Sequence, residues 1–80
     1  MHNVIIYSSP LCPYCAMAKL FFNENNIQYT DKNVSGDTAA VGEMIEKSGQ
    51  LGVPVIQIDD NILIGFDKSA VGKLLGIQEN

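Results

Sequence analysis

The sequence predicts an α/β fold in which a mixed, four-stranded sheet carries helices on both faces. Three observations predict it: a continuous apolar run near the start, helix-like periodic segments in the middle, and two apolar runs joined by a short polar turn. The resulting order is β-α-β-α-β-β-α. A β-α-β unit joins parallel strands by a right-handed crossover, whereas a short turn joins antiparallel strands, so the sheet should be mixed.

The first strand is predicted over Val4 to Tyr7, a continuous β-prone run typical of a strand that is covered on both faces. A loop from Ser8 to Leu11 follows it. Pro13 then suits the first turn of a helix, where a missing N–H group costs nothing. The start of the chain therefore predicts a strand, a loop and a helix.

That first helix should end at Asn25–Asn26. Met17, Leu20 and Phe21 recur at helical spacing and are expected to form its inward apolar face. Tyr7 and Phe21 are both expected in the core.

The middle of the chain predicts a second strand and a second helix. Ile27 and Tyr29 alternate with polar residues, which favours a half-exposed strand over residues 27–30. Ser35–Asp37 should open the helix and Gly49 should end it. The helix is carried by Val41, Met44, Ile45 and Ser48.

The last third predicts a hairpin and a final helix. Two strands, Val55 to Ile58 and Ile62 to Ile64, are joined by the polar turn Asp59–Asn61. Asp67 can cap a helix that Gly76 ends. The residues expected to face inward are Val71, Leu74 and Leu75.

Composition narrows the function classes. The 80 residues (1–80) are expected to form one small domain. The chain has no arginine and only five lysines against nine Asp and Glu residues. Its net charge of −4 therefore predicts no positively charged surface of the kind that binds a nucleic acid. No apolar run approaches the ~20 residues of a membrane span, and the start lacks the features of a secretory signal. We expect a soluble, cytoplasmic protein without a membrane partner.

Cys12 and Cys15, the only cysteines, allow three interpretations. A structural disulfide that closes so short a loop gains only roughly 2 kcal/mol from chain entropy. A zinc site needs four ligands, and the one histidine, His2, lies at the other end of the first strand, on the order of 15 Å away. In a reducing compartment, a cysteine pair is more often catalytic or metal-binding than structural.

The third interpretation is a redox pair. If Cys12 caps the helix, its sulfur faces free N–H groups and the positive end of the dipole, which stabilise a thiolate. Cys15 would lie one turn further on, within disulfide reach, and Pro13 would fix the backbone between them. A CxxC between a strand and a helix in a βαβ pattern therefore favours an exposed nucleophile with a shielded resolving thiol.

Three motifs resemble one family. The chain is similar to the glutaredoxins, and more closely to short glutaredoxin-like redoxins, in three motifs of matching order and spacing: CPYC after VIIYSSP, then GVPVI, then IGFD. The resemblance extends from Val4 to Leu75. The resemblance implies a thioredoxin fold: a four-stranded sheet in the order 2-1-3-4, flanked by three helices.

The resemblance also implies roles for residues. Cys12 would be the attacking thiol and Cys15 the resolving one, joined in the oxidised form as a redox-active disulfide. Val53 and Pro54 match a valine followed by a cis-proline, although a trans proline at a strand start stays open from sequence alone. A cis bond would turn the backbone of Val53 toward an incoming peptide. Further substrate or glutathione contacts would come from Pro13, Tyr14, Phe66 and Asp67.

Two of these residues also have structural interpretations, and one family cation is missing. Asp67 is a good helix cap, and Tyr14 could be an exposed turn aromatic. Glutaredoxins usually carry lysine or arginine three residues before the first cysteine, where this chain has Ser9. Gly65 and Phe66 stand where glutaredoxins have two glycines, as in redoxins served by thioredoxin reductase. Without arginine, no bidentate guanidinium can hold a carboxylate of glutathione.

The sequence thus predicts a monomeric thiol–disulfide oxidoreductase that needs no bound cofactor or metal. Its substrates would be protein disulfides or mixed disulfides with glutathione, and glutathione is the expected electron donor or co-substrate. One alternative is a redoxin that is reduced by thioredoxin reductase and serves an enzyme such as ribonucleotide reductase. An alternative of another class is a binding protein in which two chains and two glutathiones hold an iron–sulfur cluster; a brown preparation bleached by a chelator would favour it.

Overall fold

The computed structural model of the chain describes residues 2–77 and has the predicted order of elements. The sheet runs in the order β2-β1-β3-β4, with β1 parallel to β2 and antiparallel to β3, and with β3 antiparallel to β4. This confirms the predicted thioredoxin fold. The elements are β1 (Val4–Ser8), α1 (Pro13–Glu24), β2 (Thr30–Asn33), α2 (Thr38–Ser48), β3 (Val55–Ile58), β4 (Asn61–Ile64) and α3 (Lys68–Leu75).

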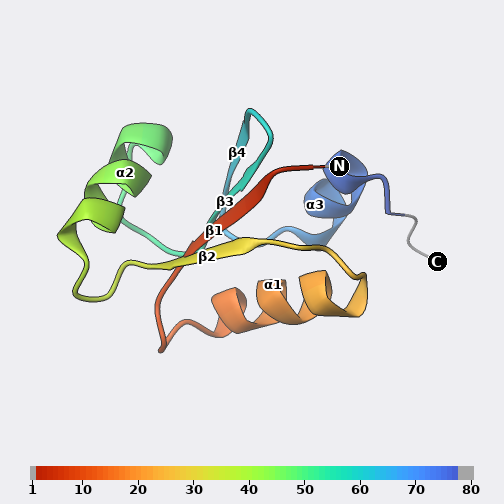
Figure 1. The fold of residues 1–80 in the computed structure, drawn as a ribbon, viewed down its shortest axis with the longest axis horizontal. Helices are drawn as coiled ribbons and strands as arrows, with labels where there is room; N and C mark the ends of the chain where they lie inside the picture. Colours follow the sequence, from red (N-terminus) through yellow and green to blue (C-terminus); the bar gives the residue numbers. More distant parts are fainter. Residues whose placement is uncertain (1, 78–80) are drawn as a thin grey trace.

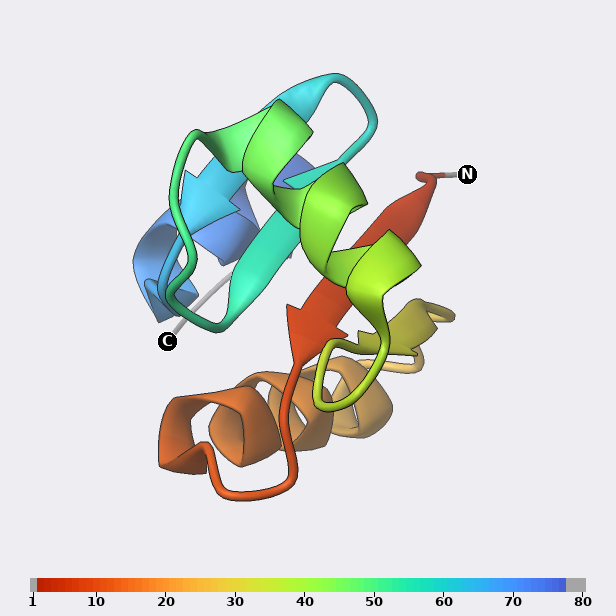
Figure 2. The ribbon, with the colours of Figure 1, turned by 90° about the vertical axis from the view of Figure 1, so that its left-hand side faces the viewer.

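The helices cover the sheet from both sides (Figure 1). Figure 2 shows α2 in front of the strands and α3 behind them. No helix within residues 2–77 has the length and apolar character needed to cross a membrane.

Alternation along the strands divides the core in two. Ile6 and Ile56 point to one face and pack with α1 and α3, whereas their neighbours Tyr7 and Val55 point to the other face and pack with Met44 of α2. A side-chain period of two along a strand produces this division. The larger core contains Val4, Ile6, Ala18, Phe21, Phe22, Ile56, Ile58, Val71 and Leu75.

The predicted second strand is displaced. The expected strand over residues 27–30 is wrong, because the ladder with β1 begins only at the pair Ile5 and Thr30 and extends to Asn33. Ile27 and Tyr29 do alternate with exposed residues, but they pack against the core ahead of the ladder. The alternating apolar residues therefore contribute to the core, and the strand itself consists of the polar residues that follow them at the edge of the sheet.

The hairpin differs by one residue from its prediction. Asn61 pairs with Ile58 and so belongs to β4, which leaves Asp59 and Asp60 as the turn. Asp59 has a φ of 55°, a conformation that aspartate tolerates better than most residues. β1 also continues one residue beyond its prediction, to Ser8.

The inward face of α1 also needs a correction. Phe21 is buried as predicted, but Met17 is 52% exposed and Leu20 is 58% exposed. The residues that α1 buries with Phe21 are Cys15, Ala18 and Phe22, which repeat at helical spacing. The true inward face is therefore rotated from the predicted one, because the chain before the helix and the contacts with the sheet decide which stripe turns inward.

The predicted ends of the other helices are confirmed. The carboxylates of Asp37 and Asp67 accept the N–H groups of the third residue that follows each, so both residues are N-caps. Gly49 and Gly76 end α2 and α3 in the left-handed conformation, each with a φ of 74°.

A polar cluster joins α2 to the sheet. The hydroxyl of Tyr7 donates to Glu43 Oε1 over 2.6 Å, and Lys32 and Lys47 donate to the same oxygen. Lys47 also donates to the Tyr7 hydroxyl and to Gln57, each over 2.7 Å. The hydrogen bond from Lys32, followed by that from Tyr7, lowers the pKa of Glu43 to about 2. Burial and the hydrogen bond to Glu43 raise the pKa of Tyr7.

This cluster predicts an acid-sensitive contribution to stability. A carboxyl whose pKa is lower in the folded than in the unfolded chain stabilises the fold above its ordinary pKa of 4.5, and this contribution is lost as the pH falls toward about 2. Glu43→Gln should therefore flatten the decline of the urea midpoint between those pH values. Glu46→Gln, on an exposed residue of the same helix, is the control and should keep the wild-type slope. Parallel slopes for Glu43→Gln and the wild type would contradict the prediction.

Candidate active site

The two cysteines stand at the start of α1. Cys12 is its N-cap, with φ −104° and ψ 106°, and Pro13 occupies the first helical turn. Cys12 and Cys15 form a disulfide with their Cα atoms 5.2 Å apart. The Cys15 N–H group donates to Cys12 Sγ over 3.1 Å. Cys12 is half-buried, whereas Cys15 is only 1% exposed, so solvent reaches the two sulfur-bearing residues unequally.

The local sequence explains this geometry and its electrostatics. Cys12 is extended, so its side chain folds over the first turn as a capping serine would. The first turn of α1 contains no acidic residue that would oppose a negative sulfur. Free N–H groups and the positive end of the helix dipole therefore face Cys12, which favours its thiolate once the disulfide is reduced.

The sheet brings the other two motifs to the same end of the molecule. The pairing of Tyr7 with Val55 puts the end of β1, which leads to the cysteines, beside the start of β3. Gly65 N–H donates to the carbonyl of Pro54 over 2.8 Å, so the end of β4 also lies there. The Val53–Pro54 peptide bond is cis.

Residues of these segments line an open pocket of about 370 Å³. Five of the eight predicted site residues line it, and the other three, Cys12, Pro13 and Cys15, form the helix start that adjoins it through Tyr14. Two further lining residues, Ile64 and Gly65, were not among the predicted site residues, although both stand in the IGFD motif. The lining residues are Tyr14, Val53, Pro54, Ile64, Gly65, Phe66 and Asp67.

Within residues 2–77, Asp67 is the only charged residue that lines this pocket. Its Oδ1 accepts the Ala70 N–H group over 3.2 Å as the cap of α3. Lys47 does not line the pocket, because its ammonium group donates to Tyr7, Glu43 and Gln57 in the polar cluster that joins α2 to the sheet, here called the α2 cluster. Ser9 is half-buried, and its carbonyl accepts the Cys12 N–H group over 3.4 Å.

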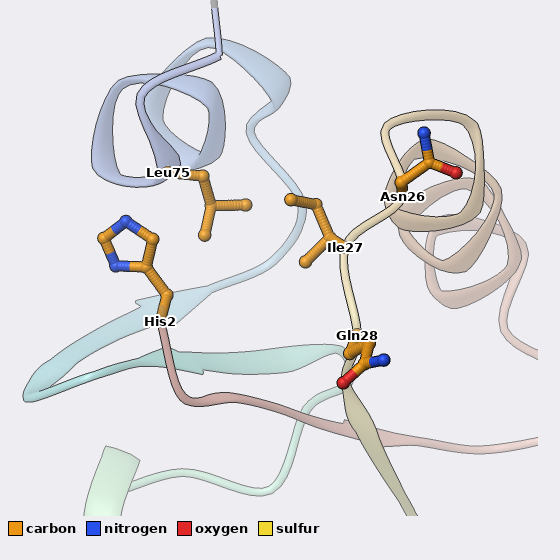
Figure 3. A pocket seen from close by; sticks show the side chains of 5 residues that line it. All are labelled: His2, Asn26, Ile27, Gln28 and Leu75. Carbon is orange, nitrogen blue, oxygen red and sulfur yellow. The ribbon is translucent and has the colours of Figure 1, made fainter.

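A cavity of similar volume, about 360 Å³, lies at the opposite end of β1 (Figure 3). It contains none of the predicted site residues, so volume alone does not locate the site. Its lining residues are His2, Asn26, Ile27, Gln28 and Leu75.

Known proteins resemble this chain in sequence and in structure. The family model described as glutaredoxin matches residues 4–63. An uncharacterized glutaredoxin-like 8.6 kDa protein in the rubredoxin operon of Clostridium pasteurianum is 46% identical over 70 residues, which cover 88% of this chain and 93% of that protein. Glutaredoxin 3 of Escherichia coli (strain K12) is 37% identical over 67 residues, which cover 84% and 81% of the two chains.

Among solved structures, a mutant of the thioredoxin-like protein BC3987 superimposes with a TM-score of 0.89 at 29% identity. The superposition covers 98% of this chain and 100% of that one. The range matched by the family model contains both cysteines and the Val53–Pro54 bond, and it ends before Phe66 and Asp67.

Proposed function

The chain belongs to the glutaredoxin family of thiol–disulfide oxidoreductases, and we propose that its Cys12 and Cys15 reduce protein disulfides or mixed disulfides with glutathione. The observation that carries this proposal is the position of Cys12 at the N-cap of α1, with Cys15 one turn on and shielded from solvent. Such a pair combines an activated nucleophile with a resolving thiol.

The first step is attack by the Cys12 thiolate on one sulfur of the substrate disulfide. A Cys12–substrate disulfide forms, the substrate S–S bond breaks, and the second substrate sulfur leaves as a thiolate that takes a proton from solvent. The Cys15 N–H group, which already donates to Cys12 Sγ, stabilises the attacking charge without reorganisation.

The second step is attack by Cys15, as a thiolate, on Cys12 Sγ. It forms the intramolecular disulfide and releases the remaining substrate thiolate. Across both steps the substrate gains two electrons and two protons, and the protein dithiol loses them. The Cα separation of 5.2 Å lies within the range that a disulfide accepts, so the second step needs little movement of the helix.

The pocket beside the cysteines is the proposed substrate site. The backbone of Val53, which lines this pocket beside the cis bond to Pro54, would pair with an extended peptide, while Tyr14 and Phe66 would supply apolar walls. Asp67 uses one oxygen as a cap, and its second oxygen can accept a substrate ammonium group such as that of the γ-glutamyl unit of glutathione.

One observation favours a second candidate for the electron donor. Glutathione carries two carboxylates, but the charged residue that lines the pocket is itself a carboxylate. Lys47, whose ammonium group has three acceptors in the α2 cluster, does not supply the missing cation. This charge pattern favours reduction of the Cys12–Cys15 disulfide by thioredoxin reductase, after which the protein would pass electrons to an enzyme such as ribonucleotide reductase.

A side-by-side assay tests both proposals. A low-molecular-weight disulfide is offered with NADPH and either glutathione plus glutathione reductase or thioredoxin reductase alone. Consumption of NADPH with either system supports the dithiol cycle, and the faster system identifies the donor. No consumption with either system, by a protein whose two thiols titrate as free, would overturn the proposed cycle.

The substitution Ser9→Lys tests the importance of the missing cation. A partly exposed charge pair is worth only ~0.2–1 kcal/mol, so we expect a gain of about 1.4- to fivefold in turnover with glutathione. Turnover with thioredoxin reductase should change little. Ser35→Lys adds the same charge in an exposed loop and serves as the control. Equal glutathione turnover in Ser9→Lys and Ser35→Lys would show that position 9 does not determine the use of glutathione.

A further inference from the structure

Helix α1 exposes an apolar stripe that the core does not use. Its inward face is complete with Cys15, Ala18, Phe21 and Phe22, yet Tyr14, Met17 and Leu20 are exposed along the outer side. Leu11, just before the helix, is also exposed. Exposed apolar residues that gather on one side of a helix, rather than standing singly, are typical of an interaction surface.

The stripe borders a groove of about 140 Å³ between α1 and the start of α3. The Phe21 ring packs against the Phe66 ring with their centres 5.8 Å apart, and Lys68 Nζ lies 5.8 Å above the centre of the Phe21 ring. The groove is therefore apolar inside, with one side chain of each charge at its rim. Its lining residues are Met17, Leu20, Phe21, Glu24, Phe66 and Lys68.

We propose that this groove, the α1 groove, binds an apolar side chain of a protein substrate while Cys12 reacts with that substrate's cysteine. The proposal rests on the proposed function and names its substrate class: a protein disulfide with a leucine-sized apolar residue near one cysteine. Opposite charges at the rim leave the groove without a net preference for a charged side chain.

Continuity with the reaction site supports this occupant. Phe66 lines both the α1 groove and the pocket beside the cysteines, so the two hollows adjoin at this ring and one bound chain can reach both. Met17 and Leu20 follow Cys12 by five and eight residues, which corresponds to about 7–12 Å along a helix. An extended peptide covers that length in about two to four residues. The apolar residue should therefore stand at that separation from the reacting cysteine.

The chemistry of glutathione separates it from such a protein substrate. Glutathione consists of a γ-glutamyl unit, a cysteine and a glycine, and it has no apolar side chain for the groove. Loss of the groove should therefore affect protein and peptide substrates and leave small disulfides unchanged.

The test compares two peptides of equal length, each with a single cysteine. One peptide has leucine and the other has serine three positions from that cysteine. The comparison is made once with this residue before the cysteine and once with it after the cysteine. Each cysteine is joined to 5-thio-2-nitrobenzoate, whose release is followed by absorbance in single turnovers of the reduced protein. We expect the leucine peptide to react about tenfold faster at low concentration, on at least one side. Met17→Ser and Leu20→Ser should remove most of this preference.

Two controls make the outcome specific. Ile45→Ser replaces an exposed apolar residue of α2, on the other face of the sheet, and should keep the preference. Bis(2-hydroxyethyl) disulfide should react equally with the wild type and all three variants. A wild type that does not distinguish the peptides, or a loss shared by Ile45→Ser, would overturn the groove proposal alone, whereas failure to reduce even the small disulfide would overturn the proposed function beneath it.

Discussion

Replacing Cys12 by serine should reduce disulfide turnover by more than about a thousandfold. Cys12 is the cysteine at the N-cap, where a thiolate is stabilised, and Cys15 is too buried to meet a substrate directly. A serine hydroxyl at the same place is not ionised at neutral pH and does not attack a disulfide. The measurement is the turnover of a small disulfide with whichever reducing system supports the wild type.

Cys15→Ser is the matched control, since it removes the other sulfur and leaves the nucleophile. This variant should accumulate a stable disulfide between Cys12 and a protein substrate, which mass spectrometry detects as an adduct. Cys12→Ser should accumulate none. Adducts on Cys15 in Cys12→Ser, or turnover within tenfold of the wild type, would show that the two roles are assigned in the wrong order.

Phe22→Ala should cost about 3–5 kcal/mol in the free energy of unfolding. The Phe22 ring is fully buried, and it lies 5.2 Å from the Tyr29 ring and 6.3 Å from the Phe21 ring, measured between centres. Its removal leaves a cavity under the helix that bears the cysteines. A loss of about 3 kcal/mol or more is a large part of the ~5–15 kcal/mol by which such domains are stable. At about 4 °C or more for each kcal/mol, the melting temperature should fall by at least about 12 °C.

Leu20→Ala, two residues earlier on the same helix, is the control for Phe22→Ala. Leu20 is exposed, so its truncation should change the free energy of unfolding by less than about 0.5 kcal/mol. Similar losses in the two variants would mean that Leu20 also belongs to the core, as the sequence pattern predicts and the structure contradicts.

Several features of this protein could be predicted from the sequence because they depend on neighbours along the chain. Pro13 after a cysteine predicts a helix start, Asp67 predicts a cap, and Gly76 predicts an end; all three are set by local backbone geometry. Continuous apolar runs bounded by polar turns likewise predicted β1 and β3. Motif resemblance then supplied the strand order and the family.

Tertiary contacts decided which side of α1 faces the core and at which residue the pairing of β2 with β1 begins. A helix that is apolar on several sides offers more than one possible inward stripe, so the burial of Ala18 and Phe22 in place of Met17 and Leu20 was decided by the sheet beneath α1. In β2, the apolar residues pack before the ladder, and the parallel partner β1 determines that hydrogen bonding begins at Thr30.

The site shows the same division. The position of the CxxC motif between a strand and a helix favoured a redox pair at a helix start, because three residues span about one helical turn. The pocket, in contrast, needed long-range pairing: antiparallel β3 and β4 bring Pro54 against Gly65, and thereby place Phe66 and Asp67 near a turn more than fifty residues earlier. Such pairing depends on hydrogen bonds between distant strands, and so only the tertiary structure decided that a second groove opens beside the same phenylalanine.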